Sequence, residues 1–179
     1  SDVCSSDLEW WGIPRTTDEV FWPDTPGFAE SGVRPQYVMA GRRGEATQEL
    51  EVYDLERRPL LDAEITERTL RFIEDSVHQE RPFFAYVPLT QVHLPTLPHP
   101  DFKGRTGHGD FADSVVETDH RVGQLLDRLR ELGVEEDTLV IFTSDNGPDP
   151  TWPWQGTSGP WRGYYFTHME GSDRKSTRL

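Results

Sequence analysis

The chain has 179 residues, with 32 acidic and 18 basic side chains and a formal net charge of −14. A hydrophobic content of 34% is lean, but six Trp, nine Phe and five Tyr are typical of a folded protein, because disordered chains lack aromatic residues. The length suits one domain or a large piece of a bigger one, no run approaches the ~18 apolar residues of a membrane span, and the negative charge opposes nucleic-acid binding.

The two ends differ from the rest of the sequence. Residues 1–8 and 173–179 are short polar runs that resemble translated cloning sequence, so we exclude both from the fold and treat residues 9–172 as one folded piece. The single cysteine, Cys4, lies in the first run and leaves no disulfide framework. Residues 9–60 have aromatic, Pro and Gly residues without a helical period, which indicates an irregular excursion with at best a short strand near Leu50 and Val52.

A helix is predicted from Asp62, which is placed to cap its N-terminus, to Pro82, which stops it. Its apolar residues recur at helical spacing: Ile65, Leu70, Ile73 and Val77. Residues 83–89 then form a continuous apolar run, which is typical of a strand buried on both faces. The segment 90–109, rich in Pro, His and Gly, is expected to be a loop.

The clearest predicted element is a second helix from about 111 to 132. One apolar stripe runs along it: Phe111, Val115, Val122, Leu125, Leu126, Leu129 and Leu132. Asp110 with Asp113 resembles a capping box, and Gly133 stands where a helix-ending glycine belongs. Residues 138–143 predict a second buried strand, and this order of elements is typical of an α/β fold with a mixed, largely parallel sheet flanked by helices.

Two loops begin where the predicted strands end, which is where ligands gather in open α/β sheets. The first presents His93, which suits either binding of an anionic substrate or proton transfer, or is an ordinary solvated loop residue. The second presents Asp145 and Asn146, whose carboxylate and amide oxygens are the ligands that Ca²⁺ or Mg²⁺ prefers. Residues of these types also dominate simple turns, so the loop alone leaves both interpretations open.

Taken in order, these segments resemble the sulfatase family. The run RPFFAYVPLTQVHLP at 81–95 is similar to the family's strand with its active-site histidine. The helix, the strand and the SDNGP sequence at 144–148 are similar to the segment that carries the calcium ligands, and residues 159–171 to the glycine-rich segment after it. The resemblance extends over residues 9–172 and implies an alkaline-phosphatase-like partial domain.

By this resemblance the chemistry is hydrolysis of a sulfate ester of a small molecule or glycan. In the family a Cys is converted to formylglycine, whose hydrate attacks sulfur. Asp145 and Asn146 would hold Ca²⁺ or Mg²⁺, and His93 would contact the sulfate or assist the leaving oxygen. Arg162 and Tyr165 fall in the substrate-binding segment. The family's usual location is periplasmic, secreted or lysosomal.

The sequence departs from the family at its nucleophile. Cys4 is not followed by the family pattern Cys-x-Pro/Ala-x-Arg, so we reject it. Ser158 with Arg162 fits the rarer serine form, but it follows Asp145 instead of preceding it and no helix-forming sequence comes after it, which favours a loop. Tyr165 stands where many members have Lys, and a tyrosine supplies a hydrogen bond but no charge.

These departures predict an internal fragment that is inactive by itself, and they leave two alternatives. A phosphatase or phosphodiesterase of the same superfamily would favour paired zinc, with His in place of Asn146. A truncated, non-catalytic domain would at most bind an anion.

Overall fold

The computed structural model describes residues 9–15, 22–149, 156–172 and 176–178 of the chain. They belong to two compact units, Ser1–Arg128 and Leu129–Leu179. Every strand pairing within the described ranges is antiparallel. None of the helices described there combines the length and apolar character that crossing a membrane requires.

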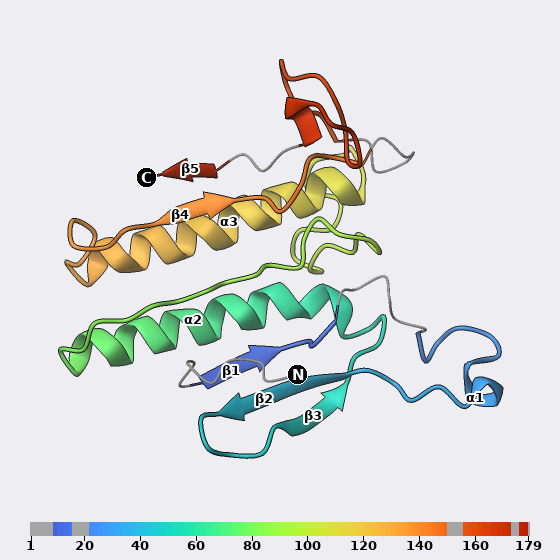
Figure 1. The fold of residues 1–179 in the computed structure, drawn as a ribbon, viewed down its shortest axis with the longest axis horizontal. Helices are drawn as coiled ribbons and strands as arrows, with labels where there is room; N and C mark the ends of the chain where they lie inside the picture. Colours follow the sequence, from blue (N-terminus) through green and yellow to red (C-terminus); the bar gives the residue numbers. More distant parts are fainter. Residues whose placement is uncertain (1–8, 16–21, 150–155, 173–175, 179) are drawn as a thin grey trace. The chain divides into compact units, whose positions relative to one another are not determined.

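A three-stranded meander opens the first unit (Figure 1). Strand β1 (Glu9–Gly12) pairs with β2 (Tyr37–Arg42), which pairs with β3 (Gln48–Val52), and a short helix α1 (Phe28–Ser31) lies between β1 and β2 in the chain. The predicted short strand is confirmed as β3. The prediction of an irregular segment is wrong for β1 and β2, because the sequences of these short strands show no apolar alternation.

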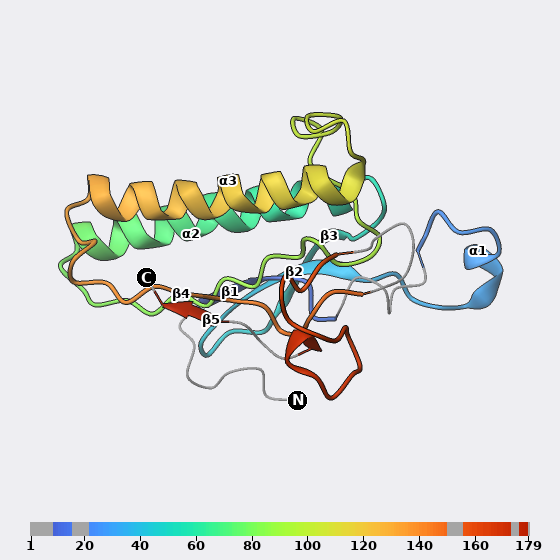
Figure 2. The same cartoon turned by 90° about the horizontal axis from the view of Figure 1, so that it is seen from above.

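Helix α2 (Leu61–His78) packs on one face of this sheet (Figure 2) and follows a 3₁₀ turn, η1 (Arg58–Leu60). Val38 and Tyr53 meet Leu61 and Ile65 in a buried cluster. Burial raises the pKa of the Tyr53 phenol well above its usual range. Helix α2 confirms the helix predicted between Asp62 and Pro82.

Asp62 does not cap α2, and that prediction is wrong. It is the second residue of the helix, and the Leu60 position before the helix has no side-chain cap. The Asp62 carboxylate instead accepts hydrogen bonds from Thr90 and Gln91. The Asp62 carboxylate therefore binds donors far along the chain and not the first N–H groups of its own helix.

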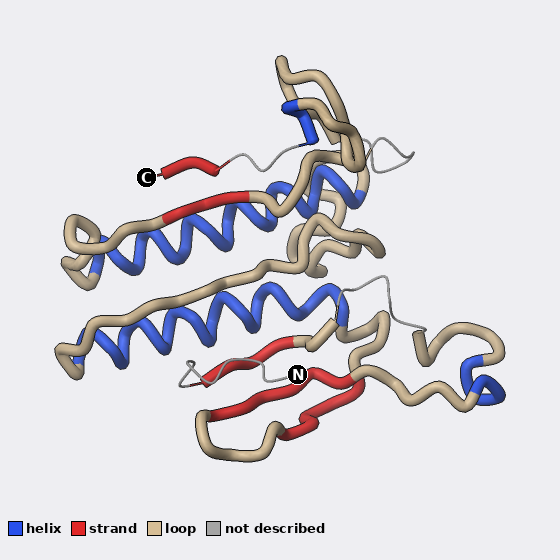
Figure 3. The backbone as a smooth tube through the Cα atoms, in the orientation of Figure 1, coloured by secondary structure: helices blue, strands red, loops and turns tan. Residues whose placement is uncertain are grey.

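Residues 82–90 run beside α2 as an extended segment that has no strand partner in the part of the chain that the structure describes (Figure 3). Val87 and Leu89 pack against the buried cluster. Phe84 and Tyr86, which point the other way, are 83% and 82% exposed. The expectation of burial on both faces is therefore wrong for this structure, because one face of the segment is open.

Helix α3 (Asp110–Glu131) confirms the second predicted helix, and its Arg128 forms an ion pair with Glu74 of α2 at 3.2 Å. The buried side chains from its start to its midpoint are polar: Asp113, Ser114, Glu117 and, just past the midpoint, Arg121. Val115, which the predicted apolar stripe includes, is 46% exposed. The apolar stripe is therefore wrong as a description of this half.

The two ends of α3 differ in how well the sequence predicted them. The expected capping box is wrong, because the Asp113 carboxylate accepts hydrogen bonds from Gly104 and Thr106 in the preceding loop. The C-terminal end is confirmed: Gly133 has φ +70°, its N–H donates to Arg130 O at 3.0 Å, and Val134 N–H donates to Leu129 O at 3.1 Å. These are the two bonds of a Schellman motif.

The second unit holds β4 (Ile141–Thr143), paired with β5 (Ser176–Arg178), and a 3₁₀ turn, η2 (Glu170–Ser172). The strand predicted at 138–143 is confirmed in shorter form. Its expected burial is wrong, since Ile141 is 62% exposed. Strand β5 lies in the C-terminal run 173–179, which we excluded from the predicted fold. The non-native origin of that run stays a prediction. Cys4, in the N-terminal run, lies outside the described residues.

Candidate functional site

His93 lies in a tight turn just after the extended segment. Its backbone N–H donates to Thr90 O at 3.1 Å, and its ring Nδ1 lies 2.9 Å from Leu94 O. Because a carbonyl oxygen only accepts, this contact requires a proton on Nδ1. The rotation of the His93 ring is thus set by its neighbour Leu94, with Nε2 on the opposite side of the ring.

Buried charged side chains hold the backbone of this loop at its start and again near His99. Arg58 and Asp62, which are 0% and 2% exposed, bind the turn at Thr90–His93. Farther along, Glu117 accepts a hydrogen bond from His99 N–H at 2.8 Å and one from Arg121 at 3.2 Å. The loop is irregular in backbone but fixed in position.

Sequence reasoning missed Arg58 and Glu117, and it assigned Asp62 to the wrong role. Isolated charged residues near a helix are typical of a solvated surface, and Arg or Glu is almost never fully buried unless it is paired. The available signal was weak: Asp62 and Glu117 stand on helix faces that also carry apolar residues.

Asp113 fixes the next stretch of the loop. Its pKa lies below the usual range, mainly because Thr106 N–H donates to the carboxylate, with further bonds from the Thr106 hydroxyl and Gly104 N–H. Each of these bonds favours the ionised carboxylate.

The predicted metal-binding turn follows β4. Asp145 is exposed, and its carboxylate has no hydrogen bond or ion pair within the described ranges. Ser144 Oγ donates to Asn146 O at 2.7 Å, and Asn146 Nδ2 donates to Gly147 O at 2.9 Å. The side-chain oxygen of Asn146 is the atom of this amide that can bind a hard cation, because the amide nitrogen has no acceptor capacity.

Arg162 and Tyr165 are brought to this turn by backbone contacts. Tyr165 N–H donates to Pro148 O at 2.9 Å, and Gly171 N–H donates to Arg162 O at 2.6 Å. Gly147 N–H in turn donates to Ser172 O at 3.1 Å. The second unit therefore assembles four of the five predicted site residues, while His93 belongs to the first unit.

The donor set fits a hard divalent cation in kind. One carboxylate and one amide oxygen are suitable, but Ca²⁺ takes about six to eight oxygens. The described residues contain no group of three or more His, Cys, Asp or Glu side chains arranged to hold a metal ion. Asp145 and Asn146 can thus supply part of a site that needs further ligands.

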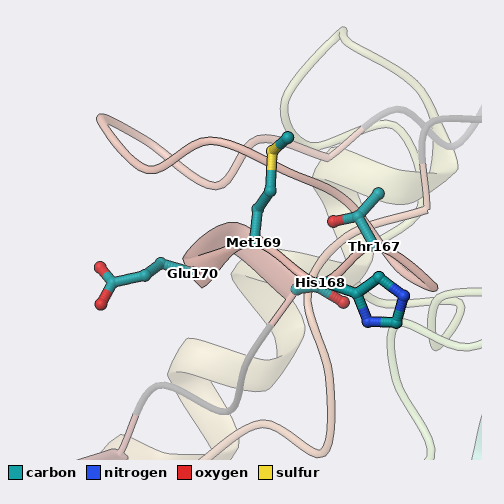
Figure 4. A pocket seen from close by; sticks show the side chains of 5 residues that line it. Thr167, His168, Met169 and Glu170 are labelled. Carbon is teal, nitrogen blue, oxygen red and sulfur yellow. The ribbon is translucent and has the colours of Figure 1, made fainter.

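Two other features of the second unit lack the geometry of a reactive centre. The Ser158 hydroxyl lies 2.7 Å from Trp161 O and 3.1 Å from Gly163 O, so it closes a loop. An open depression of about 310 Å³ is lined by Thr167, His168, Met169, Glu170 and Ser172. Figure 4 shows that the side chains of His168, Met169 and Glu170 point in different directions, so they do not converge on a ligand.

Comparison with known proteins decides the family. The family model named Sulfatase matches residues 24–174, a range that contains both loops. The chain belongs to the sulfatase family. Human arylsulfatase A is 35% identical over 147 residues, and the N-acetylgalactosamine-6-O-sulfatase of Bacteroides thetaiotaomicron is 40% identical over 84 residues.

The match covers only part of each relative. The aligned regions are 77% of this chain and 28% of arylsulfatase A, and 47% of this chain and 16% of the Bacteroides enzyme. The crystal structure of the PsFucS1 sulfatase from Pseudoalteromonas sp. superposes with a TM-score of 0.84 at 29% identity, covering 96% of this chain and 37% of that one. This sulfatase chain therefore has part of the family's fold and spans less than a third of the length of the two curated relatives.

Proposed function

We propose that the chain is a segment of a longer sulfuric ester hydrolase, and that the complete protein hydrolyses a sulfate monoester with the help of a divalent cation. The observation that carries this proposal is the family match over residues 24–174, which includes the His93 loop and the Asp145–Asn146 turn. In the complete protein we expect further strands beside residues 82–90, giving the mixed, largely parallel sheet.

We assign sulfate binding to Arg162 and Tyr165, and sulfate contact or proton transfer to His93. A sulfate monoester is an anion, so its transition state needs cations and hydrogen-bond donors around the sulfate oxygens. Arg162 would supply a positive charge and Tyr165 a hydroxyl donor. His93, with the Nδ1 proton directed at Leu94 O, would use Nε2 to contact the sulfate or carry a proton to the leaving oxygen.

Asp145 and Asn146 would contribute two oxygens to Ca²⁺ or Mg²⁺, which supplies Lewis-acid polarisation of the sulfate when bound. Asn146 favours a single hard cation over the paired zinc of the phosphatase alternative. The formylglycine nucleophile is expected from a part of the complete protein that this chain does not encode. Sulfated glycans or small molecules are the expected substrates, and export is the expected location.

An assay with an activated aryl sulfate tests this function. The chain alone should show no turnover above an unrelated control protein, and the complete protein should be active. In the complete protein, His93→Ala should lower kcat by about 10²–10⁴-fold, as for other acid–base groups, with little change in melting temperature. Preferential hydrolysis of an aryl phosphate, with two zinc ions bound, would identify a phosphatase instead.

A further inference from the structure

The turn that carries His93 rests on two buried side chains that point at its backbone. Asp62 Oδ1 accepts from Thr90 N–H at 2.8 Å and from the Thr90 hydroxyl at 2.7 Å, and Asp62 Oδ2 accepts from Gln91 N–H at 3.0 Å. One carboxylate thereby satisfies two consecutive backbone donors and a side-chain donor.

Arg58 binds the acceptors of the same turn. Its Nη1 donates to the Thr90 hydroxyl at 2.7 Å, and its Nη2 lies 3.1 Å from Thr90 O, 3.4 Å from Gln91 Oε1 and 3.1 Å from His93 O. The Thr90 hydroxyl accepts from Arg58 while it donates to Asp62, so it links the two charges. A planar guanidinium can reach several acceptors at once in a way that an ammonium cannot.

We propose that Arg58 and Asp62 are positioning residues, whose role is to hold the His93 imidazole in its reactive orientation. The inference rests on the proposed function of His93. Among the described residues, every side-chain hydrogen bond of Arg58 and Asp62 goes to Thr90, Gln91 or His93.

The burial of these charges distinguishes positioning from simple packing. Arg58 is 0% exposed, and its Nε has no hydrogen-bond partner among the described residues, which is itself unfavourable. Removing two charges from water is costly, and apolar side chains of similar volume often stabilise a fold equally well. The two charges do restrict the backbone of the turn, because they bind Thr90 N–H, Gln91 N–H, Thr90 O and His93 O.

Arg58 and Asp62 act on the His93 imidazole through the backbone of the turn. Arg58 fixes His93 O, and Asp62 fixes the backbone where the turn begins, so the Cα–Cβ direction of His93 is set. The Nδ1 contact with Leu94 O then sets the ring rotation and directs Nε2. A displacement of about 1 Å at such a group can lower a rate about 10²-fold.

Kinetics of the complete protein test the proposal with Asp62→Asn and Arg58→Lys. Both variants keep much of the side-chain shape, but the amide introduced by the first presents an N–H group where the carboxylate accepts, and the lysine introduced by the second loses the guanidinium geometry. The matched controls are Asp75→Asn and Arg71→Lys, which change exposed residues of α2. We expect kcat per folded molecule to fall about 10- to 100-fold in the first pair, with KM little changed, and to stay near the starting value in the controls.

A double-mutant cycle separates positioning from stability. If Asp62 acts through His93, Asp62→Asn should lower kcat in the original protein and have no further effect in the His93→Ala background. A lower melting temperature with unchanged kcat per folded molecule, or multiplicative effects of the two substitutions, would overturn the proposal. Arg58→Lys provides the same cycle if Asp62→Asn does not fold.

Nitrogen NMR of the histidine rings in the 179-residue chain gives a readout that does not depend on activity. The original chain should show His93 as the Nδ1–H tautomer, and Asp62→Asn should give mixed tautomers and faster exchange of the Gln91 amide, whereas Asp75→Asn should not. If His93→Ala leaves kcat unchanged, the proposed function of His93 fails, while the NMR result still decides the orienting role. A single unchanged tautomer in both Asp62→Asn and Arg58→Lys would overturn it.

Discussion

Replacing Gly147 by alanine should disrupt the second unit, because the space beside this residue is filled by backbone. An added Cβ would lie 1.9 Å from Gly171 O, 2.8 Å from Gly171 C and 2.9 Å from Ser172 Cα. A side chain can rotate away from a new methyl group, but these atoms can move only if the chain segments separate. The expected perturbation is therefore larger than for an ordinary Gly→Ala change.

The contacts around Gly147 set the size of the expected loss in the free energy of local opening. Separation would break the Gly147 N–H bond to Ser172 O at 3.1 Å and would move Gly171 away from Arg162 O. Overpacking costs about 1–3 kcal/mol and each lost hydrogen bond about 0.5–1.5 kcal/mol. We expect a loss of about 3 kcal/mol in the free energy of local opening, which is a factor of roughly 10² in the opening equilibrium.

Gly123→Ala is the matched control, because a Cβ at this position in α3 would meet nothing within 4 Å apart from its chain neighbours and the backbone of its own helix. Alanine should stabilise the helix there by about 0.5–1 kcal/mol. Native-state hydrogen exchange of the amide protons at positions 147 and 171 measures the free energy of local opening in both variants. Equal protection in Gly147→Ala and the original chain would refute the packing of the segments around Gly147, Arg162 and Gly171.

Two further predictions concern carboxylates. In the complete protein, Asp145→Ala should abolish divalent-ion binding and activity together, because Asn146 beside it offers a neutral oxygen and no charge; full calcium retention by elemental analysis would contradict this. Since hydrogen bonds from Thr106 and Gly104 hold the pKa of Asp113 below its usual range, its ionised form stabilises the fold above the unfolded pKa of about 3.9. That contribution to stability should be lost as the pH falls from about 4 through the lower folded pKa. An acid titration followed by tryptophan fluorescence should show this loss in the original chain and not in Asp113→Asn. Identical titrations of the two proteins would show that these bonds contribute nothing to stability.

The helices could be predicted from the sequence because their signals are local. The periodicity of α2 and the glycine at the end of α3 depend only on residues within a few positions, and both are confirmed. The strands could not be predicted as well, since their pairing depends on distant partners. β1 pairs with β2 across a long connection, and the burial of residues 83–89 depends on neighbours that the described chain does not supply.

The candidate site was predicted in part for the same reason. Motif order placed Asp145, Asn146, Arg162 and Tyr165 in one segment, and the backbone contacts of the second unit bring these residues together. Their roles, and that of His93, stay predictions. The buried partners of the His93 loop left no local signal, because nothing in the sequence around Arg58 shows that Thr90 and His93 will lie against it.

One physical requirement explains both the irregular loop and the errors in the predicted helix faces. The loop from Thr90 to Thr106 has no sheet or helix ladder to satisfy its backbone N–H groups, and buried donors must still be paired. Carboxylates of α2 and α3 accept from them: Asp62 from Thr90 and Gln91, Glu117 from His99, and Asp113 from Gly104 and Thr106. Each of these carboxylates occupies a helix position where local rules predict a cap or a solvated charge. Backbone bonds within the loop, such as His93 N–H to Thr90 O and Phe102 N–H to His99 O, satisfy only some of its donors. The helices thus depart from simple patterning where their carboxylates bind the remaining ones.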